Sequence, residues 1–96
     1  MSMNMPPPIP SEQSLIEYPC HFPIKVMGAQ VEGFEAAMLH IARAFDPTFD
    51  ERTVERRPSK AGNYLGLTLT VYVTSREQLD ELYRTLTTHP MVKVVL

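Results

Sequence analysis

The stretch from Tyr64 to Val73 alternates strictly between two kinds of side chain, and it limits the fold more than any other part of the sequence. One set of alternate positions is aliphatic: Leu65, Leu67, Leu69, Val71 and Val73. The other set is aromatic, hydroxylated or glycine: Tyr64, Gly66, Thr68, Thr70 and Tyr72. Because successive side chains of a β-strand point to opposite faces, this pattern predicts a long strand with one apolar face. Its length and apolarity predict the centre of a sheet.

Two further elements are predicted on the N-terminal side of this strand. Residues 22–27 alternate in the same way and predict a strand that ends at Gly28. A helix is then predicted from apolar residues at spacings of three and four, namely Val31, Phe34, Met38, Ile41 and Phe45. Asp46-Pro47 ends this helix, because the residue before proline avoids helical backbone angles.

Three more elements complete the predicted order. Residues 49–57 read as a short charged strand, which suits the edge of a sheet. Ser75 and Gln78 fit a capping box at the start of a second helix, whose apolar stripe is Leu79, Leu82, Tyr83 and Leu86. Met91 to Leu96 reads as a final strand.

The resulting order, β-α-β-β-α-β, predicts an α+β ferredoxin-like sandwich with two helices on one face of a four-stranded antiparallel sheet. The strand order in that fold is 4-1-3-2, which makes the first and third strands central. The crossovers are expected to be right-handed. The predicted core consists of Phe22, Ile24, Val26, Phe34, Met38, Ile41, Leu67, Leu69, Val71, Leu79, Leu82, Leu86, Val92 and Val94.

The first fourteen residues differ in composition from the rest of the chain. They contain four of its nine prolines, at positions 6, 7, 8 and 10. We expect a disordered Pro-rich tail over 1–14, dispensable for folding, and a single domain over 15–96. The first basic residue is Lys25, so the N-terminus lacks the charged region of a signal peptide. Cys20 is the only cysteine, so a cytoplasmic protein without an internal disulfide is expected.

Net charge argues against nucleic acid as the main partner. Nine Lys and Arg residues oppose eleven Asp and Glu residues, which gives −2 at pH 7. RNA binding stays a distant alternative, because the RNA-recognition motif shares this element order and stacks bases on sheet aromatics. Tyr64 and Tyr72 are the aromatic residues of the predicted third strand that point to the face such a motif uses.

Candidate chemistry is sparse. Cys20 and His21 are neighbours on an extended segment, so their side chains diverge and cannot share a metal ion. Residues 28–33 have the G-x-x-x-x-G spacing of a phosphate loop but lack the Lys-Ser/Thr that follows it. No Ser-His-Asp or paired-carboxylate arrangement stands out. A non-catalytic protein without metal or cofactor is predicted.

Four segments resemble the YbeD-like family of small, uncharacterised bacterial proteins. They are residues 22–28 (FPIKVMG), 57–64 (RPSKAGNY), 75–80 (SREQLD) and 90–96 (PMVKVVL), and the similarity covers about 15–96. Gly66 stands where family members often carry serine. The resemblance implies a ferredoxin-like fold similar to the ACT regulatory domains, which bind small effectors near the first strand–helix loop.

Two function classes follow. The first is a regulatory or adaptor module that binds a protein through its sheet. The second is an ACT-like sensor of an amino acid or related metabolite, with Gly28, Ala29 and Gln30 as ligand-binding residues. The equivalent ACT loop usually has an Asp and a Pro before a Gly, and this loop has neither. A flat, closed loop would favour the first class, and a pocket beside Gly28 with convergent donors would favour the second.

The sheet face left uncovered by the helices is the expected partner surface. The residues predicted to form it are Lys25, Tyr64, Thr68, Thr70, Tyr72, Met27 and Val95. This mixture is too aromatic for a purely solvated surface. The last strand has only Lys93 to discourage pairing, so self-association or the addition of a partner strand is also expected there.

Overall fold

The computed structural model describes residues 16–96, so the predicted Pro-rich tail at 1–14 lies outside the described residues. The elements in chain order are β1 (Cys20–Ala29), α2 (Phe34–Phe45), a 3₁₀ turn (Glu51–Thr53), β2 (Glu55–Pro58), β3 (Tyr64–Val73), α3 (Arg76–Thr87) and β4 (Val92–Val95). This is the predicted β-α-β-β-α-β order.

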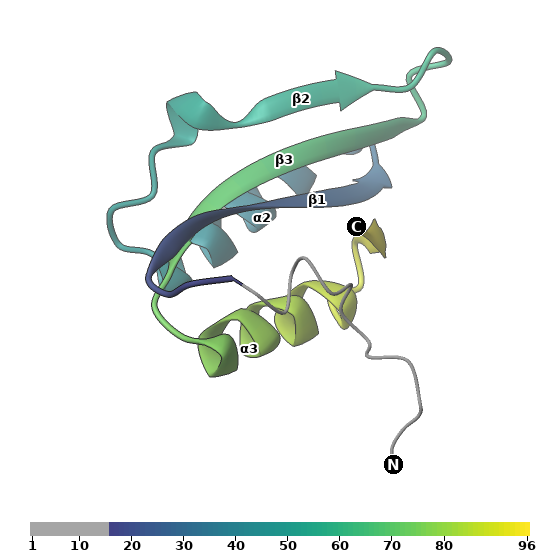
Figure 1. Ribbon diagram of the computed structural model, residues 1–96. Coiled ribbons are helices and arrows are strands. Elements are labelled where there is room, and N and C mark those ends of the chain that lie inside the picture. The colour runs from purple at the N-terminus through teal and green to yellow at the C-terminus, as the bar shows by residue number, and fades with distance from the viewer. Residues whose placement is uncertain (1–15) are drawn as a thin grey trace.

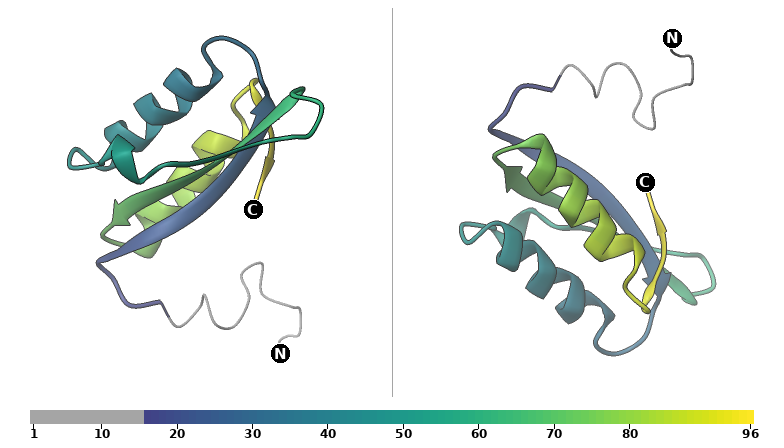
Figure 2. Two further views of the ribbon diagram at one scale, coloured as in Figure 1. Left: turned by 90° about the horizontal axis from the view of Figure 1, so that it is seen from above. Right: turned by 90° about the horizontal axis from the view of Figure 1, so that it is seen from below.

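The four strands form one antiparallel sheet in the order β2-β3-β1-β4, which is the predicted 4-1-3-2 order read from the other edge (Figure 1). The two long strands, β1 and β3, pair along their whole length, from Cys20 opposite Val73 to Ala29 opposite Tyr64. Both helices lie on one side of the sheet and run side by side there (Figure 2). Within residues 16–96, the opposite face of the sheet carries no helix.

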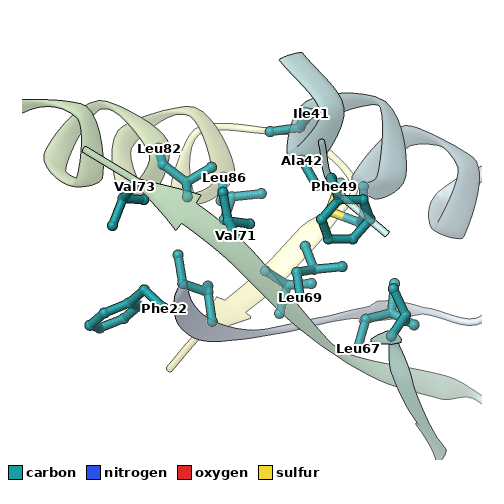
Figure 3. Packing of buried hydrophobic residues seen from close by; sticks show 14 of the residues in the cluster. Phe22, Ile41, Ala42, Phe49, Leu67, Leu69, Val71, Val73, Leu82 and Leu86 are labelled. Carbon is teal, nitrogen blue, oxygen red and sulfur yellow. The ribbon is translucent and has the colours of Figure 1, made fainter. Parts of the chain in front are cut away.

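The core lies between the sheet and the helices. Alternate residues of β1 and β3 meet the apolar stripes of α2 and α3, as Figure 3 shows for Leu69, Val71, Ile41 and Leu82. Burying these aliphatic side chains supplies the main stabilising free energy. The predicted core residues from Phe22 to Leu86 are buried. Phe49 and Val54 join them from the segment between α2 and β2.

The first helix and the first strand differ from the prediction at one corner. β1 continues through Gly28 to Ala29, so Gly28 does not end the strand. Gly33 has a φ of 92°, in the left-handed region that favours glycine, and α2 therefore begins only at Phe34. Val31 precedes the helix and is 55% exposed, so its place on the helical stripe was wrong. The second strand is also shorter than predicted, because a 3₁₀ turn occupies 51–53.

Two residues of the last strand lie on faces opposite to those predicted, whereas Val92 packs against the core as predicted. Val94 lies opposite Met27 and is 43% exposed, whereas Val95 lies opposite Val26 and packs against the core. The cause is an irregularity in the pairing of β4 with β1: Met27 lies opposite Val94 and Gly28 lies opposite Val92, so Lys93 is an extra residue in β4. An extra residue reverses the alternation of the side chains that follow it in the strand. Val94 therefore belongs to the uncovered face, and Val95 does not.

Pro23 lies inside β1 without breaking a bond of the sheet. The N–H and the C=O of Lys25 both bond to Leu96, so the backbone of Lys25 faces β4. Alternate residues of an antiparallel strand direct their backbone groups to the same neighbour, so the nitrogen of Pro23 faces that side too. Leu96 forms the last hydrogen bonds between β4 and β1. Pro23 therefore has no β4 carbonyl beside it, and its missing N–H breaks no hydrogen bond of the sheet.

Candidate functional site

The uncovered side of the sheet is the candidate site, and it is called the open face below. Its side chains form cross-strand rows. One row is Glu55, Thr68, Lys25 and Leu96; the next is Arg57, Gly66, Met27 and Val94. Towards one end β3 adds Tyr64 opposite Ala29; towards the other it adds Thr70 opposite Pro23 and Tyr72 opposite His21. The structure thus brings together the predicted residues Lys25, Met27, Tyr64, Thr68, Thr70 and Tyr72 on one face.

A hollow of about 590 Å³ lies at the centre of the open face. Its lining comes from all four strands and the β2–β3 turn: Lys25, Val26, Met27, Glu55, Arg56, Arg57, Pro58, Ser59, Tyr64, Gly66, Leu67, Thr68, Val94 and Leu96. Gly66 has no side chain to fill the space between Arg57 and Met27, its neighbours across the two strand pairs. This hollow is within the size range of protein ligand and peptide sites.

The rim of the hollow combines exposed apolar residues of β1, β3 and the β4 end with charged residues of β1 and β2. Met27, Tyr64, Val94 and Leu96 are exposed large hydrophobic residues at or beside it. Lys25 and Arg57 supply positive charge, and Glu55 supplies one negative charge. Within residues 16–96, none of these three charged side chains forms an ion pair. They are therefore free to pair with groups on a partner.

Arg56 is oriented differently from its neighbours on β2. It lies opposite Leu67, so its side chain belongs to the helix side of the sheet. Its guanidinium donates two hydrogen bonds to the Glu35 carboxylate of α2, one of them from Nε at 2.7 Å. The hydrogen bond from Arg56 holds the pKa of Glu35 below its usual range, although partial burial opposes this. Arg56 thus fastens β2 to α2, and Arg57 is the β2 arginine presented to the open face.

The corner predicted to bind a ligand, Gly28 to Gln30, is filled. A Cβ atom added to Gly28 would lie 2.5 Å from Cε1 of Phe34 and closer still to the carbonyl oxygen of Met91. The N–H of Gln30 donates to the carbonyl of Asn63 at 2.8 Å. These three residues do not line the hollow. Close packing of β1, α2 and β4 therefore takes the space that a ligand would need beside Gly28.

The far end of the open face is built around Asp46, which the sequence showed only as the end of a helix. The rings of His21 and Tyr72 lie 4.9 Å apart, and the Asp46 carboxylate accepts the backbone N–H of Tyr72. Asp46 also accepts the N–H and the hydroxyl of Thr48. Burial opposes ionisation of Asp46, but these hydrogen bonds, with the charge of His21, outweigh it and lower the pKa of this carboxyl. The cluster is structural, because its acceptors are already occupied.

No group of three or more His, Cys, Asp or Glu side chains among residues 16–96 is placed to hold a metal ion. No helix in that part of the chain is long and apolar enough to cross a bilayer.

Relatives of the chain are small bacterial proteins. A UPF0250 protein of Leptothrix cholodnii is 69% identical over 88 residues, which cover 92% of this chain and 97% of that protein. A UPF0250 protein of Bordetella pertussis is 62% identical over the same shares of both chains. The family model described as "Protein of unknown function (DUF493)" matches residues 13–96. The chain belongs to this family. The predicted resemblance to the YbeD-like proteins is thereby confirmed.

The DUF493 fold is also found in a solved structure. The solution structure of protein HP0495 from H. pylori superposes with a TM-score of 0.72 and covers 99% of this chain and 98% of that one. The two sequences are 17% identical, so the match concerns the fold alone. It agrees with the predicted ferredoxin-like sandwich.

The hollow itself was not predicted from the sequence. Glu55 and Arg57 read as part of a charged edge, and nothing local indicated which of β2's charges face the open side. The signal lies in the β2–β3 hairpin: Gly62 has a φ of 77°, and the turn sets Arg57 opposite Gly66. Alternation from that pair places Glu55 on the same face and Arg56 on the other.

Proposed function

We propose that this DUF493 protein is a non-catalytic regulatory or adaptor domain, spanning residues 15–96 and acting in the cytoplasm, that binds another protein through the open face of its sheet. The observation that carries this proposal is the hollow centred on Gly66, with unpaired charges and exposed apolar residues at its rim. Protein-binding surfaces combine an apolar centre with a polar rim in this way.

Two observations support protein binding over the alternatives. The filled corner at Gly28 argues against the ACT-like sensor with a ligand at Gly28–Gln30. Tyr64 and Tyr72 are eight residues apart on β3, or roughly 26 Å at a rise of about 3.3 Å per residue. Two bases stacked side by side on a sheet need closer aromatics, which argues against RNA binding.

The test is capture of partners from the native cytoplasm by the full chain, with mass spectrometry of both proteins and small molecules. Two variants give it a matched comparison. Gly66→Val adds a side chain inside the hollow, and Thr70→Val places the same residue type on the same strand and face outside the lining. We expect a protein that the wild type and Thr70→Val retain and that Gly66→Val loses. Retention of only a small molecule, or equal capture by Gly66→Val, would reject the proposal.

A further inference from the structure

The arrangement of charge around the hollow restricts what can occupy it. Arg57 lies opposite Gly66 on one side of β3, and Lys25 lies opposite Thr68 on the other side. The two cations are therefore separated by two strand spacings and by two residues along the strands. With strands about 4.8 Å apart and a rise of about 3.3 Å per residue, their Cα atoms are roughly 12 Å apart.

That separation matches an extended peptide. Residues i and i+4 of an extended chain are about 13 Å apart, and residues i, i+2 and i+4 point to the same side. Carboxylates at i and i+4 would reach Arg57 and Lys25. The side chain at i+2 would then lie over the middle of the diagonal, where Gly66 leaves the space open beside Met27.

Glu55 determines which of the two diagonals across the hollow suits an acidic segment. It shares a row with Thr68 and Lys25, one alternate position along β2 from Arg57. A carboxylate placed on the other diagonal, from Glu55 to Met27, would meet a negative charge at one end and a thioether at the other. Only the diagonal from Arg57 to Lys25 carries a cation at both ends.

The same charges argue against a second copy on this face. Apart from Arg56, which pairs with Glu35, the side chains that line the hollow carry two positive charges and one negative charge, whereas the whole chain carries −2. Two copies packed face to face would bring like-charged surfaces together. An acidic partner meets no such repulsion.

We infer that the hollow binds an extended segment of a partner protein with an acidic residue, an apolar residue and an acidic residue at alternate positions. This inference rests on the proposed function and specifies its ligand. The apolar side chain is buried over Gly66, and the two carboxylates pair with Arg57 and Lys25. Exposed ion pairs each add little binding free energy. The carboxylates therefore select the Arg57–Lys25 diagonal and give specificity, and the apolar contact supplies most of the affinity.

The experiment is a titration of the ¹⁵N-labelled full chain with synthetic pentapeptides, followed by amide NMR, which measures weak binding. The probe is Glu-Thr-Leu-Thr-Glu, and the controls are Gln-Thr-Leu-Thr-Gln, Glu-Thr-Gly-Thr-Glu and the reordered Glu-Glu-Leu-Thr-Thr. We expect the probe to shift the amide signals of Met27, Gly66 and Thr68. We expect each control peptide to bind about five- to tenfold more weakly.

Variants of the chain identify the contacts. Gly66→Val should weaken the probe more than about tenfold, and Thr70→Val should leave it unchanged. The backbone leaves room for a Cβ at Gly66, since the nearest atom to it is the Arg57 carbonyl oxygen at 3.6 Å. Lys25→Glu should weaken the probe and strengthen Lys-Thr-Leu-Thr-Glu or Glu-Thr-Leu-Thr-Lys, whichever places its lysine against the new carboxylate. The amide spectrum of each variant shows directly whether it is folded.

Several results would overturn the inference. They are equal binding of the glutamate and glutamine peptides, an unchanged affinity in Gly66→Val, and no shift on the open face with any peptide. Open-face shifts that depend on protein concentration without peptide would assign the face to a second copy instead. Loss of the cytoplasmic partner in Gly66→Val together with failure of the acidic peptides would reject this ligand chemistry and leave the proposed function standing.

Discussion

The carboxylate of Asp46 accepts the backbone N–H of Tyr72 across 3.0 Å and thereby connects the end of α2 to β3. β2 pairs with β3 only from Leu65 to Thr68, so the N–H of Tyr72 lies beyond the end of its neighbouring strand. Asp46 supplies the acceptor that a longer β2 would have supplied. A single side chain thus completes the hydrogen bonding of a central strand.

Asp46→Ala should lower the free energy of unfolding by about 1.5–3 kcal/mol, because a buried charged acceptor of three hydrogen bonds from Thr48 and Tyr72 is lost. Asp80→Ala is the control, since Asp80 pairs only with Arg76 in an exposed i,i+4 ion pair. That change should cost no more than about 0.5 kcal/mol. Urea denaturation of both variants measures the difference, and equal losses would contradict the role given to Asp46.

The same carboxylate makes stability depend on pH. The pKa of Asp46 is lower in the folded state than in the unfolded state. Below about pH 4 the unfolded chain therefore binds more protons than the folded chain, and stability decreases as the pH decreases. The contribution is fully present above that pH and is lost as the pH drops through the lowered pKa. Asp46→Asn should flatten this part of the curve. Glu35 and Asp50, whose pKa values are also lowered, remain in both proteins, so an unchanged slope would assign the dependence to them.

Two glycines on neighbouring strands give a matched pair. Gly28→Ala should cost about 1–3 kcal/mol, because its Cβ would overlap the Phe34 ring and the Met91 carbonyl. Gly66→Ala should be neutral or stabilising by up to about 1 kcal/mol, since a Cβ there meets nothing closer than 3.6 Å. Thermal unfolding of the two variants measures both. If Gly66→Ala were the more destabilising change, the packing around these two positions would be wrong.

Leu69 tests the assignment of faces on β3. It is fully buried between the sheet and the helices, so Leu69→Ala should cost about 2–5 kcal/mol. Val31→Ala removes apolar surface from an exposed position and should change stability by less than about 0.5 kcal/mol. Chemical denaturation gives both values, and a near-zero loss for Leu69→Ala would mean that the faces of β3 are reversed.

Self-association through the apolar last strand stays a prediction, and the structure changes the variant that tests it. Val95 packs against the core, so Val95→Lys would damage the fold, whereas Val94 is exposed beside the free side of β4. Sedimentation equilibrium over a hundredfold concentration range should show a dimer that Val94→Lys weakens. One monomer mass at every concentration would leave binding of another protein as the use of this edge.

Removal of residues 1–14 should lower the midpoint of thermal unfolding by no more than about 4 °C, equivalent to roughly 1 kcal/mol at this size. The core cluster is made by residues from Phe22 onward. A longer deletion through Pro19 is the control and should cost more, because Ile16 and Tyr18 pack against the core. Equal effects of the two deletions would contradict this division.

The elements whose periodicity is local were predicted from the sequence. The alternation of β3 gave its position and faces, and the Ser75 hydroxyl does accept the N–H of Gln78 at the start of α3. The faces of Val94 and Val95 were missed, because they depend on the extra residue Lys93 in β4, which the pattern of apolar residues does not reveal. Asp46 was missed as an acceptor because Tyr72 is 26 residues away.

In the candidate site, too, the features that depend on local alternation were predicted and those that depend on long-range pairing were not. Alternation assigned Lys25, Thr68 and both tyrosines to the uncovered face, which the strand pairing confirms. The hollow depends on four strands meeting in one register, and that register comes from the hairpin turn and the β1–β4 pairing. Long-range pairing of this kind has no signature within any single segment.

Pro23 limits how far any strand can grow along β1. Beyond the bonds of Lys25 to Leu96, the next backbone position directed to that side is a ring nitrogen with nothing to donate. A β4 strand lengthened past Leu96 would lack the hydrogen bond that Pro23 cannot donate, so added residues should not pair with β1. Pro23 therefore limits the length over which β4 can pair with β1. A fluorescent protein or purification tag fused after Leu96 should therefore leave the number of strand pairs unchanged.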